Sequence, residues 1–172
     1  MQIVSFIILG IMAIVFFTSL NFYDTKYELL NYPIRAFYHA NISHLVANAI
    51  SFFSLSFIEN VLGSVQFTIA MVFIWIVSSI ILYIIHRIFP SRKKYTVGFS
   101  GVIFGLMVIY YFLLNKSPGI TLVGLIVSIL PQVIVPGISF EGHLSGIIAG
   151  FIYVFLFGLN KKNPSAIKNI GI

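Results

Sequence analysis

The sequence predicts an all-α membrane protein, one domain over residues 1–172 built as a bundle of six transmembrane helices. Of its 172 residues, 59% are hydrophobic and only 8% are charged, and the mean hydropathy is +1.06. Soluble domains carry about 25% charged residues, so a water-soluble globular domain is excluded. A bilayer-spanning helix takes about 20 mostly apolar residues, and the chain is long enough for six such helices with short connections.

The charge pattern and the lack of cysteine exclude further classes of function. Ten Lys and Arg against four Asp and Glu give a formal net charge of +6. The basic residues are scattered over loops and the carboxyl-terminal tail instead of following one surface, so we expect no nucleic-acid partner. Because the chain has no cysteine, disulfides, thiolate metal sites and thiol nucleophiles are impossible.

Six apolar runs, separated by charges, Pro and Gly, mark the expected spans. They cover residues 2–20, 42–58, 66–86, 100–114, 119–136 and 143–159. The first run lacks the charged start and cleavage site of a signal peptide, so we expect it to remain as a helix. Glu59 closes the second run and is expected to anchor a loop or cap neighbouring backbone. Pro131 lies inside the fifth run, where it should kink or loosen the helix.

Glycines four residues apart occur in the fourth and sixth runs, as Gly101 with Gly105 and Gly146 with Gly150. Small residues at this spacing let membrane helices approach closely. The pattern predicts direct contact between these two helices. On their own, such pairs indicate ordinary helix packing with no chemistry.

A serine and a histidine stand near the start of these glycine faces. Ser100 immediately precedes Gly101, and His143 lies three residues before Gly146, so the two side chains are expected to be neighbours. A serine hydroxyl becomes a useful nucleophile when an adjacent base takes its proton, and imidazole suits that task. Ser100 and His143 are therefore candidates for a nucleophile and base.

The fourth run is too short to reach across the bilayer from surface to surface. Fifteen residues span about 22 Å, against a hydrocarbon core of about 30 Å. The helix should therefore begin below the membrane surface, preceded by irregular backbone around Gly98 that lines a wet pocket. The helix N-terminus would add N–H donors suited to a developing oxyanion, and Gly98 and Gly101 would permit close approach of a substrate.

His44 and Asn48 in the second run are four residues apart and share a helical face. Polar groups inside a bilayer are costly and usually face the bundle interior, so this pair is expected at the same pocket, where both could bind an oxyanion. Hydrogen bonding between helices is an equally good explanation for the pair alone.

The other ionisable residues are given smaller roles. His39 is expected to be structural, and Glu141 to be a solvated loop charge that is poorly placed to orient His143. The single aspartate, Asp24, lies in the first connection, so a Ser-His-Asp triad lacks its third member and an aspartyl dyad is excluded. No His-Glu-x-x-His metal motif is present.

Three motifs together resemble the rhomboid family of intramembrane serine proteases. In chain order they are His39-x-x-x-x-His44-Leu45-x-x-Asn48, Gly98-Phe99-Ser100-Gly101 with Gly105, and His143-Leu144-Ser145-Gly146 with Gly150. They fall on the second, fourth and sixth expected spans, in the order of the family. The similarity covers approximately residues 35–158 and implies the minimal, six-helix rhomboid-like bundle.

The resemblance also implies roles for particular residues. Ser100 would be the nucleophile and His143 the general base and then acid, while His44, Asn48 and the Ser100 backbone N–H would form the oxyanion hole. Phe104 matches the aromatic position that packs on the catalytic imidazole. Helix five and the loop 136–142 are similar in place to the family's mobile gate and cap. The supporting glycines are Gly98, Gly101, Gly105, Gly146 and Gly150.

The implied activity is hydrolysis of peptide bonds in or near transmembrane segments of other membrane proteins, with no cofactor and no metal. The expected partners are those substrates and membrane lipid, and the expected location is multi-pass in the cell membrane. The chain departs from the family in lacking its Trp-Arg pair in the first loop. Family members of this form have cytoplasmic termini, whereas the Lys and Arg count, six in the odd connections against four on the terminal side, leans the other way.

Two other functions compete with proteolysis. A catalytically inactive rhomboid-like protein would bind transmembrane clients, but such a binder has no chemical need for a nucleophile, a base and oxyanion donors together. A small transporter or channel would line a path with polar residues. Here the few intramembrane polar residues cluster towards one end, which suits a blind pocket better than a pore.

Overall fold

The computed structural model describes residues 2–18, 26–90, 96–114, 117–133 and 139–162, and these ranges are helical with no strand. The helices are α1 (Ile3–Thr18), α2 (Glu28–Arg35), α3 (Ile42–Leu55), α4 (Phe57–Leu62), α5 (Ser64–Ile88), α6 (Ser100–Leu113), α7 (Pro118–Ile129) and α8 (Phe140–Phe157), with a 3-10 turn, η2 (Leu130–Val133), after α7. Each of the six expected apolar runs overlaps one of the longer helices, and the second run covers α3 and the first two residues of α4.

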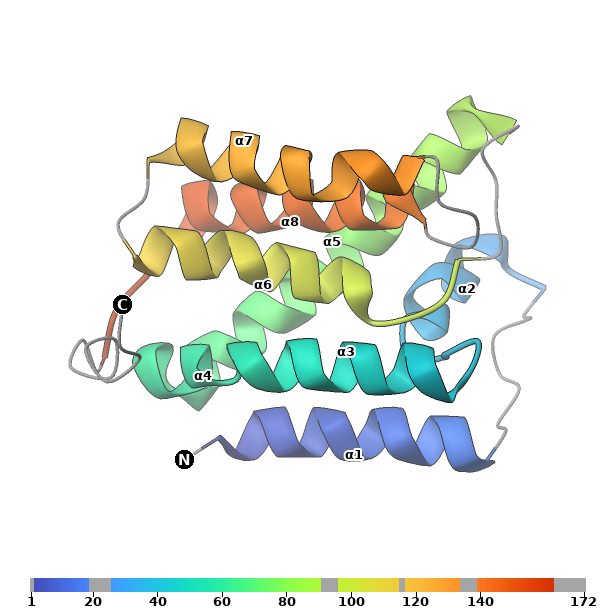
Figure 1. The fold of residues 1–172 in the computed structure, drawn as a ribbon, viewed down its shortest axis with the longest axis horizontal. Helices are drawn as coiled ribbons and strands as arrows, with labels where there is room; N and C mark the ends of the chain where they lie inside the picture. Colours follow the sequence, from blue (N-terminus) through green and yellow to red (C-terminus); the bar gives the residue numbers. More distant parts are fainter. Residues whose placement is uncertain (1, 19–25, 91–95, 115–116, 134–138, 163–172) are drawn as a thin grey trace.

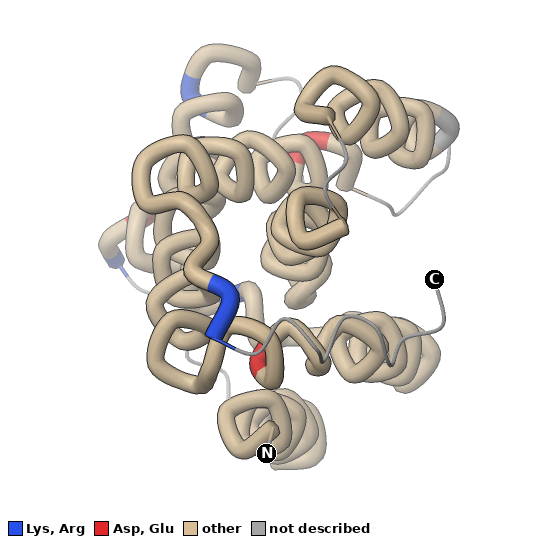
Figure 2. The backbone as a smooth tube through the Cα atoms, turned by 90° about the vertical axis from the view of Figure 1, so that its left-hand side faces the viewer, with Lys and Arg blue, Asp and Glu red and all other residues tan. Residues whose placement is uncertain are grey.

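Three of the helical stretches are long and apolar enough to cross a membrane. They are Ile42–Leu62, which joins α3 and α4, then α5 and α8. The apolar helices α1, α6 and α7 are shorter. Figure 2 shows Lys, Arg, Asp and Glu at only a few places along the helices, with long uncharged stretches between them. The all-helical prediction is therefore correct, and three spans are evident from length and composition.

Several boundaries differ from those expected. Helix α2 is absent from the six expected apolar runs, because its sequence is polar and contains Pro33. Helix α8 begins at Phe140, three residues before the expected start, since the Ser139 side chain accepts a hydrogen bond from the Gly142 N–H and caps the helix. Pro131 does not kink a longer fifth helix: α7 ends at Ile129 and the proline lies in η2. Residues 134–136 of the fifth run lie outside the described ranges.

Helices α1, α3, α6, α7 and α8 run roughly alongside one another, and α5 crosses them obliquely (Figure 1). Helix α8 packs most extensively on α6 and α5. The amino-terminal ends of α3, α6 and α8 all lie at the end of the bundle where α2 is found. Since a helix N-terminus carries unpaired N–H groups and partial positive charge, this end suits the binding of negative charge.

The expected contact between the two glycine faces is present. A Cβ added to Gly105 would lie 2.9 Å from the Gly146 carbonyl oxygen, and one added to Gly150 would lie 2.6 Å from the Gly105 carbonyl oxygen. A Cβ at Gly146 would overlap the Gly101 carbonyl. Backbone therefore packs directly on backbone along α6 and α8, which fixes the relative positions of side chains at their amino-terminal ends.

Glu59 holds the opposite end of the bundle together. Its carboxylate is 1% exposed and accepts hydrogen bonds from the Val4 N–H (3.0 Å), the Ser5 N–H (2.9 Å), the Ser5 hydroxyl (2.8 Å) and the Ser64 hydroxyl (2.7 Å). The expectation that Glu59 caps neighbouring backbone is confirmed. The residue joins the first turn of α1 to α4 and to the start of α5.

We expect Glu59→Gln to lower the free energy of unfolding by about 3 kcal/mol, because hydrogen bonds to a charged group are worth about 1.5–3 kcal/mol. The amide NH₂ would also replace one of the two carboxylate oxygens, each of which accepts from two donors. The matched control is Glu28→Gln, whose carboxylate is 38% exposed and lies 3.9 Å from Arg87. That change should cost less than about 1 kcal/mol. Unfolding of both variants in detergent measures the difference, and equal costs would contradict this role for Glu59.

Candidate active site

Ser100 and His143 meet where α6 and α8 begin. Ser100 is the first residue of α6, and His143 lies in the first turn of α8. The Ser100 Oγ lies 2.8 Å from the His143 Nε2, within the range of a hydrogen bond. The imidazole is only 9% exposed. The structure thus brings together the two residues that the sequence proposes as nucleophile and base.

Phe104 fixes the plane of the imidazole. Its ring lies one helical turn after Ser100 and stacks on the His143 ring, with centroids 4.4 Å apart and an interplanar angle of 28°. The stack limits rotation of the histidine side chain. Phe104 therefore packs on the imidazole, as the resemblance to the rhomboid family implies.

A residue that sequence reasoning missed contacts the other side of the imidazole. The Gln132 Oε1 forms a short contact with the His143 Nδ1. Gln132 belongs to η2, the turn after α7. No motif marks this glutamine, and the one available signal is that the fifth run contains a single amide side chain beside a helix-breaking proline.

Gly98 lies two residues before Ser100, at a position that only glycine fits without strain. Its φ is +108°, in the region that L side chains rarely adopt, and its N–H donates to the Arg35 carbonyl at 3.1 Å. A Cβ at Gly98 would lie 2.7 Å from the His44 ring. A side chain at this position would therefore be strained and would also clash.

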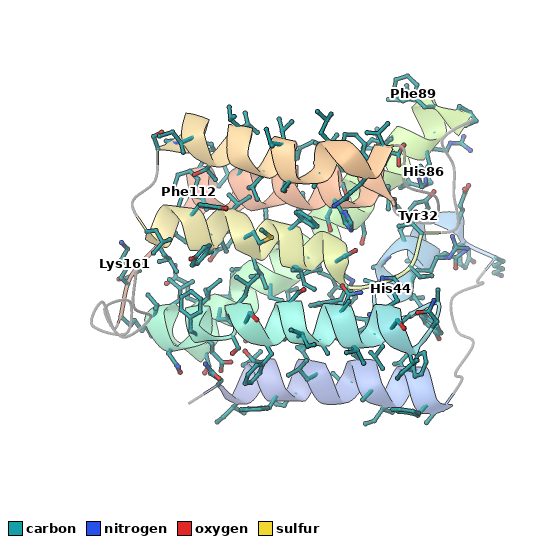
Figure 3. All side chains as sticks on the ribbon, viewed as in Figure 1. Tyr32, His44, His86, Phe89, Phe112 and Lys161 are labelled. Carbon is teal, nitrogen blue, oxygen red and sulfur yellow. The ribbon has the colours of Figure 1, made fainter. Side chains whose placement is uncertain are left out.

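His44 and Asn48 lie against this segment from the α3 side. His44 is near the amino-terminal end of α3, between α3 and α6 (Figure 3). The Asn48 Nδ2 would be 3.4 Å from a Cβ at Gly98, and it donates one hydrogen to the His44 carbonyl at 3.1 Å. An amide nitrogen carries two hydrogens, so the second remains for another acceptor. Asn48 is 4% exposed.

His39 supports His44. The two rings meet edge to face, with centroids 5.1 Å apart. Burial, together with the neighbouring His44, lowers the pKa of His39 from 6.5 to about 4, so this imidazole is neutral at physiological pH. The expected structural role agrees with this packing.

A pocket opens beside the serine. It is lined mostly by small side chains and glycines, namely Tyr32, Ala36, Ser78, Ser79, Leu82, Thr96, Gly98, Ser100, Gly101, Val102, Gly142 and Ser145. His44 and Asn48 lie against Gly98 from α3, and Gly98 is part of the pocket lining. The pocket itself extends towards α2 and α5, and the expectation that His44 and Asn48 face it stays a prediction.

Glu141 is not a solvated loop charge: it lies in the first turn of α8 and is 6% exposed, because α8 begins earlier than expected. Asp24 and the first half of the 136–142 loop lie outside the described residues.

Comparison with known proteins identifies the family. The model of the rhomboid domain matches residues 26–160. A provisionally named rhomboid protein of Acanthamoeba polyphaga mimivirus is 55% identical over 161 residues, which is 94% of each chain. The mitochondrial rhomboid-like protein 14 of Arabidopsis thaliana is 35% identical over 73% of this chain and 42% of its own length. An uncharacterized protein of Mycobacterium tuberculosis is 29% identical over 77% of this chain and 61% of its own.

The rhomboid model covers most of the chain, including Ser100, His143, His44 and Asn48. The mimivirus relative aligns over nearly the full length of both proteins. Together with the apolar helices, these matches show that the chain belongs to the rhomboid family and is an integral membrane protein.

Proposed function

We propose that the protein is an intramembrane serine endopeptidase that hydrolyses peptide bonds in or near transmembrane segments of other membrane proteins. The observation that carries the proposal is the 2.8 Å contact between the Ser100 Oγ and the His143 Nε2 at the amino-terminal end of α6. We further propose that the chain is one domain with six spans in the cell membrane. The shorter helices α1, α6 and α7 cross in that arrangement together with the three longer ones.

In the first step, the Ser100 oxygen attacks the scissile carbonyl carbon while its proton passes to the His143 Nε2. The carbonyl oxygen becomes an oxyanion. The N-cap residue of α6, Phe99, makes no side-chain hydrogen bond to the first turn, and the first backbone N–H groups of a helix, including that of Ser100, have no partner within the helix; they serve as donors here. The His44 ring and the second Asn48 hydrogen supply further donors from α3.

In the second step, the tetrahedral intermediate collapses and the carbon–nitrogen bond breaks. The imidazolium of His143 gives its proton to the leaving amine, which departs with the carboxyl-terminal fragment of the substrate. Water then attacks the Ser100 ester while His143 takes a proton from it; the bond between the acyl carbon and the serine oxygen breaks, His143 returns the proton to that oxygen, and the amino-terminal fragment leaves as a carboxylic acid. The first turn of α6 and the pair on α3 stabilise both oxyanions.

The test is cleavage of a panel of single-span substrates by the purified protein in liposomes, together with labelling by a fluorophosphonate, which reacts with activated serines independently of substrate sequence. The matched variants are Ser100→Ala and Ser54→Ala. Ser54 is exposed, and its hydroxyl donates to the Ile50 carbonyl in its own helix at 2.8 Å. Cleavage and labelling lost in Ser100→Ala and kept in Ser54→Ala support the proposal. If substrates co-purify equally with wild type and Ser100→Ala and neither is labelled, the protein is a client binder.

Asn48→Ala should reduce turnover by about 10- to 1000-fold, the scale of losing one oxyanion donor. The loss should fall on kcat, since the oxyanion exists only after attack. Asn60→Ala, on α4 near the far end of the bundle, is the control and should leave turnover of the folded protein unchanged. A fully active Asn48→Ala would remove Asn48 from the oxyanion hole.

A further inference from the structure

The His143 ring is held from three directions. Ser100 faces its Nε2 at 2.8 Å, Phe104 stacks on its face, and the Gln132 Oε1 contacts its Nδ1. Ser100 and Phe104 come from α6, whereas Gln132 comes from the turn after α7. Gln132 is the member of this set that contacts the Nδ1 side of the ring, opposite the serine.

We propose that Gln132 is a positioning residue that selects the catalytic tautomer of His143. An amide oxygen accepts hydrogen bonds and cannot donate them. A neutral imidazole carries one N–H, so an acceptor at Nδ1 places that hydrogen on Nδ1 and leaves a lone pair on Nε2. Only this tautomer can accept the Ser100 proton. This inference rests on the proposed serine-protease function.

The same contact also serves the second half of the reaction. When Nε2 takes the serine proton, both ring nitrogens carry hydrogen, and the Nδ1–H still points at the Gln132 oxygen. The amide dipole therefore stabilises the imidazolium without requiring a buried carboxylate. A neutral amide is cheaper to bury than a charge, which suits a ring that is 9% exposed.

The nearby carboxylate is badly placed for this role. Glu141 is buried but precedes His143 by two residues on α8. Two residues rotate a helix by about 200°, so side chains at this spacing point to opposite sides. Among the described residues, Gln132 is the one that contacts the His143 Nδ1.

The experiment compares wild type with Gln132→Met and Gln132→Glu in liposomes. Methionine keeps the length of the side chain without a strong acceptor, and glutamate keeps the acceptor oxygen. We expect Gln132→Met to lower kcat by about 10- to 100-fold, the usual cost of removing a group that orients an imidazole, with KM nearly unchanged. Gln132→Glu should keep kcat much closer to that of wild type. Gln2→Met, beside the start of α1, is the matched control and should cleave as wild type does.

Heteronuclear NMR of the imidazole nitrogens gives a readout that needs no activity. In wild type, His143 should be the Nδ1–H tautomer, and in Gln132→Met the Nε2–H form should become populated.

An unchanged tautomer in Gln132→Met, or kcat equal to wild type, overturns the inference even if the protein is a protease. If wild type cleaves nothing, the proposed function fails and the tautomer comparison still decides the role of Gln132. If Gln132→Met does not fold, Gln132→Glu still decides, because a loss of the Nδ1–H tautomer there overturns the inference.

Discussion

Replacing His143 by alanine should reduce turnover by about a million-fold, and adding Ser100→Ala to that variant should cost almost nothing more. The two side chains act as one unit, because the Ser100 Oγ is an effective nucleophile only while the His143 Nε2 lies 2.8 Å away to take its proton. Either single substitution removes the whole unit. The two losses therefore do not add.

The measurement is a double-mutant cycle on cleavage in liposomes, with wild type, Ser100→Ala, His143→Ala and the double variant. His86→Ala is the matched histidine control: His86 is buried, its Nδ1 lies 3.0 Å from the Tyr32 hydroxyl, and it belongs to the last turn of α5 and not to the dyad. Its folded fraction should cleave as wild type does. Additive losses for Ser100 and His143 would show that the two residues do not form a catalytic pair.

Much of this arrangement can be predicted from the sequence, because each motif lies within one or two turns of a helix. The spacing of Gly101 with Gly105 and of Gly146 with Gly150 defines which faces of α6 and α8 can touch. Once these faces are in contact, Ser100 and His143 must be near each other. Local periodicity thus carries tertiary information when the contact is between backbones.

The features that sequence reasoning missed depend on where the chain turns. Gln132 reaches His143 because α7 ends at Ile129 and a 3-10 turn follows; Pro131 signals an interruption of the run, but it does not show which side chain the turn directs at His143. Glu141 is buried because the Ser139 cap starts α8 before the apolar run does. The short helix α2 is too polar to stand out, although its Arg35 carbonyl accepts the Gly98 N–H.

The number of membrane spans is another feature that the hydropathy of the sequence does not determine. The expected six runs correspond to apolar helices, yet α6 has 14 residues, about 21 Å of helix against a core of about 30 Å. Hydropathy alone cannot say whether such a helix crosses. In this structure α6 packs more extensively on α8 than on any other helix, so its position in the bundle is set by that contact and not by its own length.

Gly146→Val should be the most damaging single change to the fold. A Cβ at Gly146 would overlap the Gly101 carbonyl, and that atom belongs to the backbone of α6, which cannot move as a side chain can. Overpacking of a tight core usually costs about 1–3 kcal/mol and more where nothing yields. We expect at least about 3 kcal/mol here, with α6 and α8 forced apart.

Thermal unfolding in detergent tests this, with Gly10→Val as the matched control. Outside α1 itself, no described residue has an atom within 4 Å of a Cβ at Gly10, so that change should be within about 1 kcal/mol of wild type. Gly146→Ala separates the two consequences, because it adds the overlapping Cβ alone. If Gly146→Ala folds, the widened gap between α6 and α8 should lengthen the Ser100–His143 contact. The rate of cleavage by the folded protein should then fall, even where the free energy of unfolding changes little. A Gly146→Val variant as stable as Gly10→Val would mean that the close backbone contact does not hold these helices together.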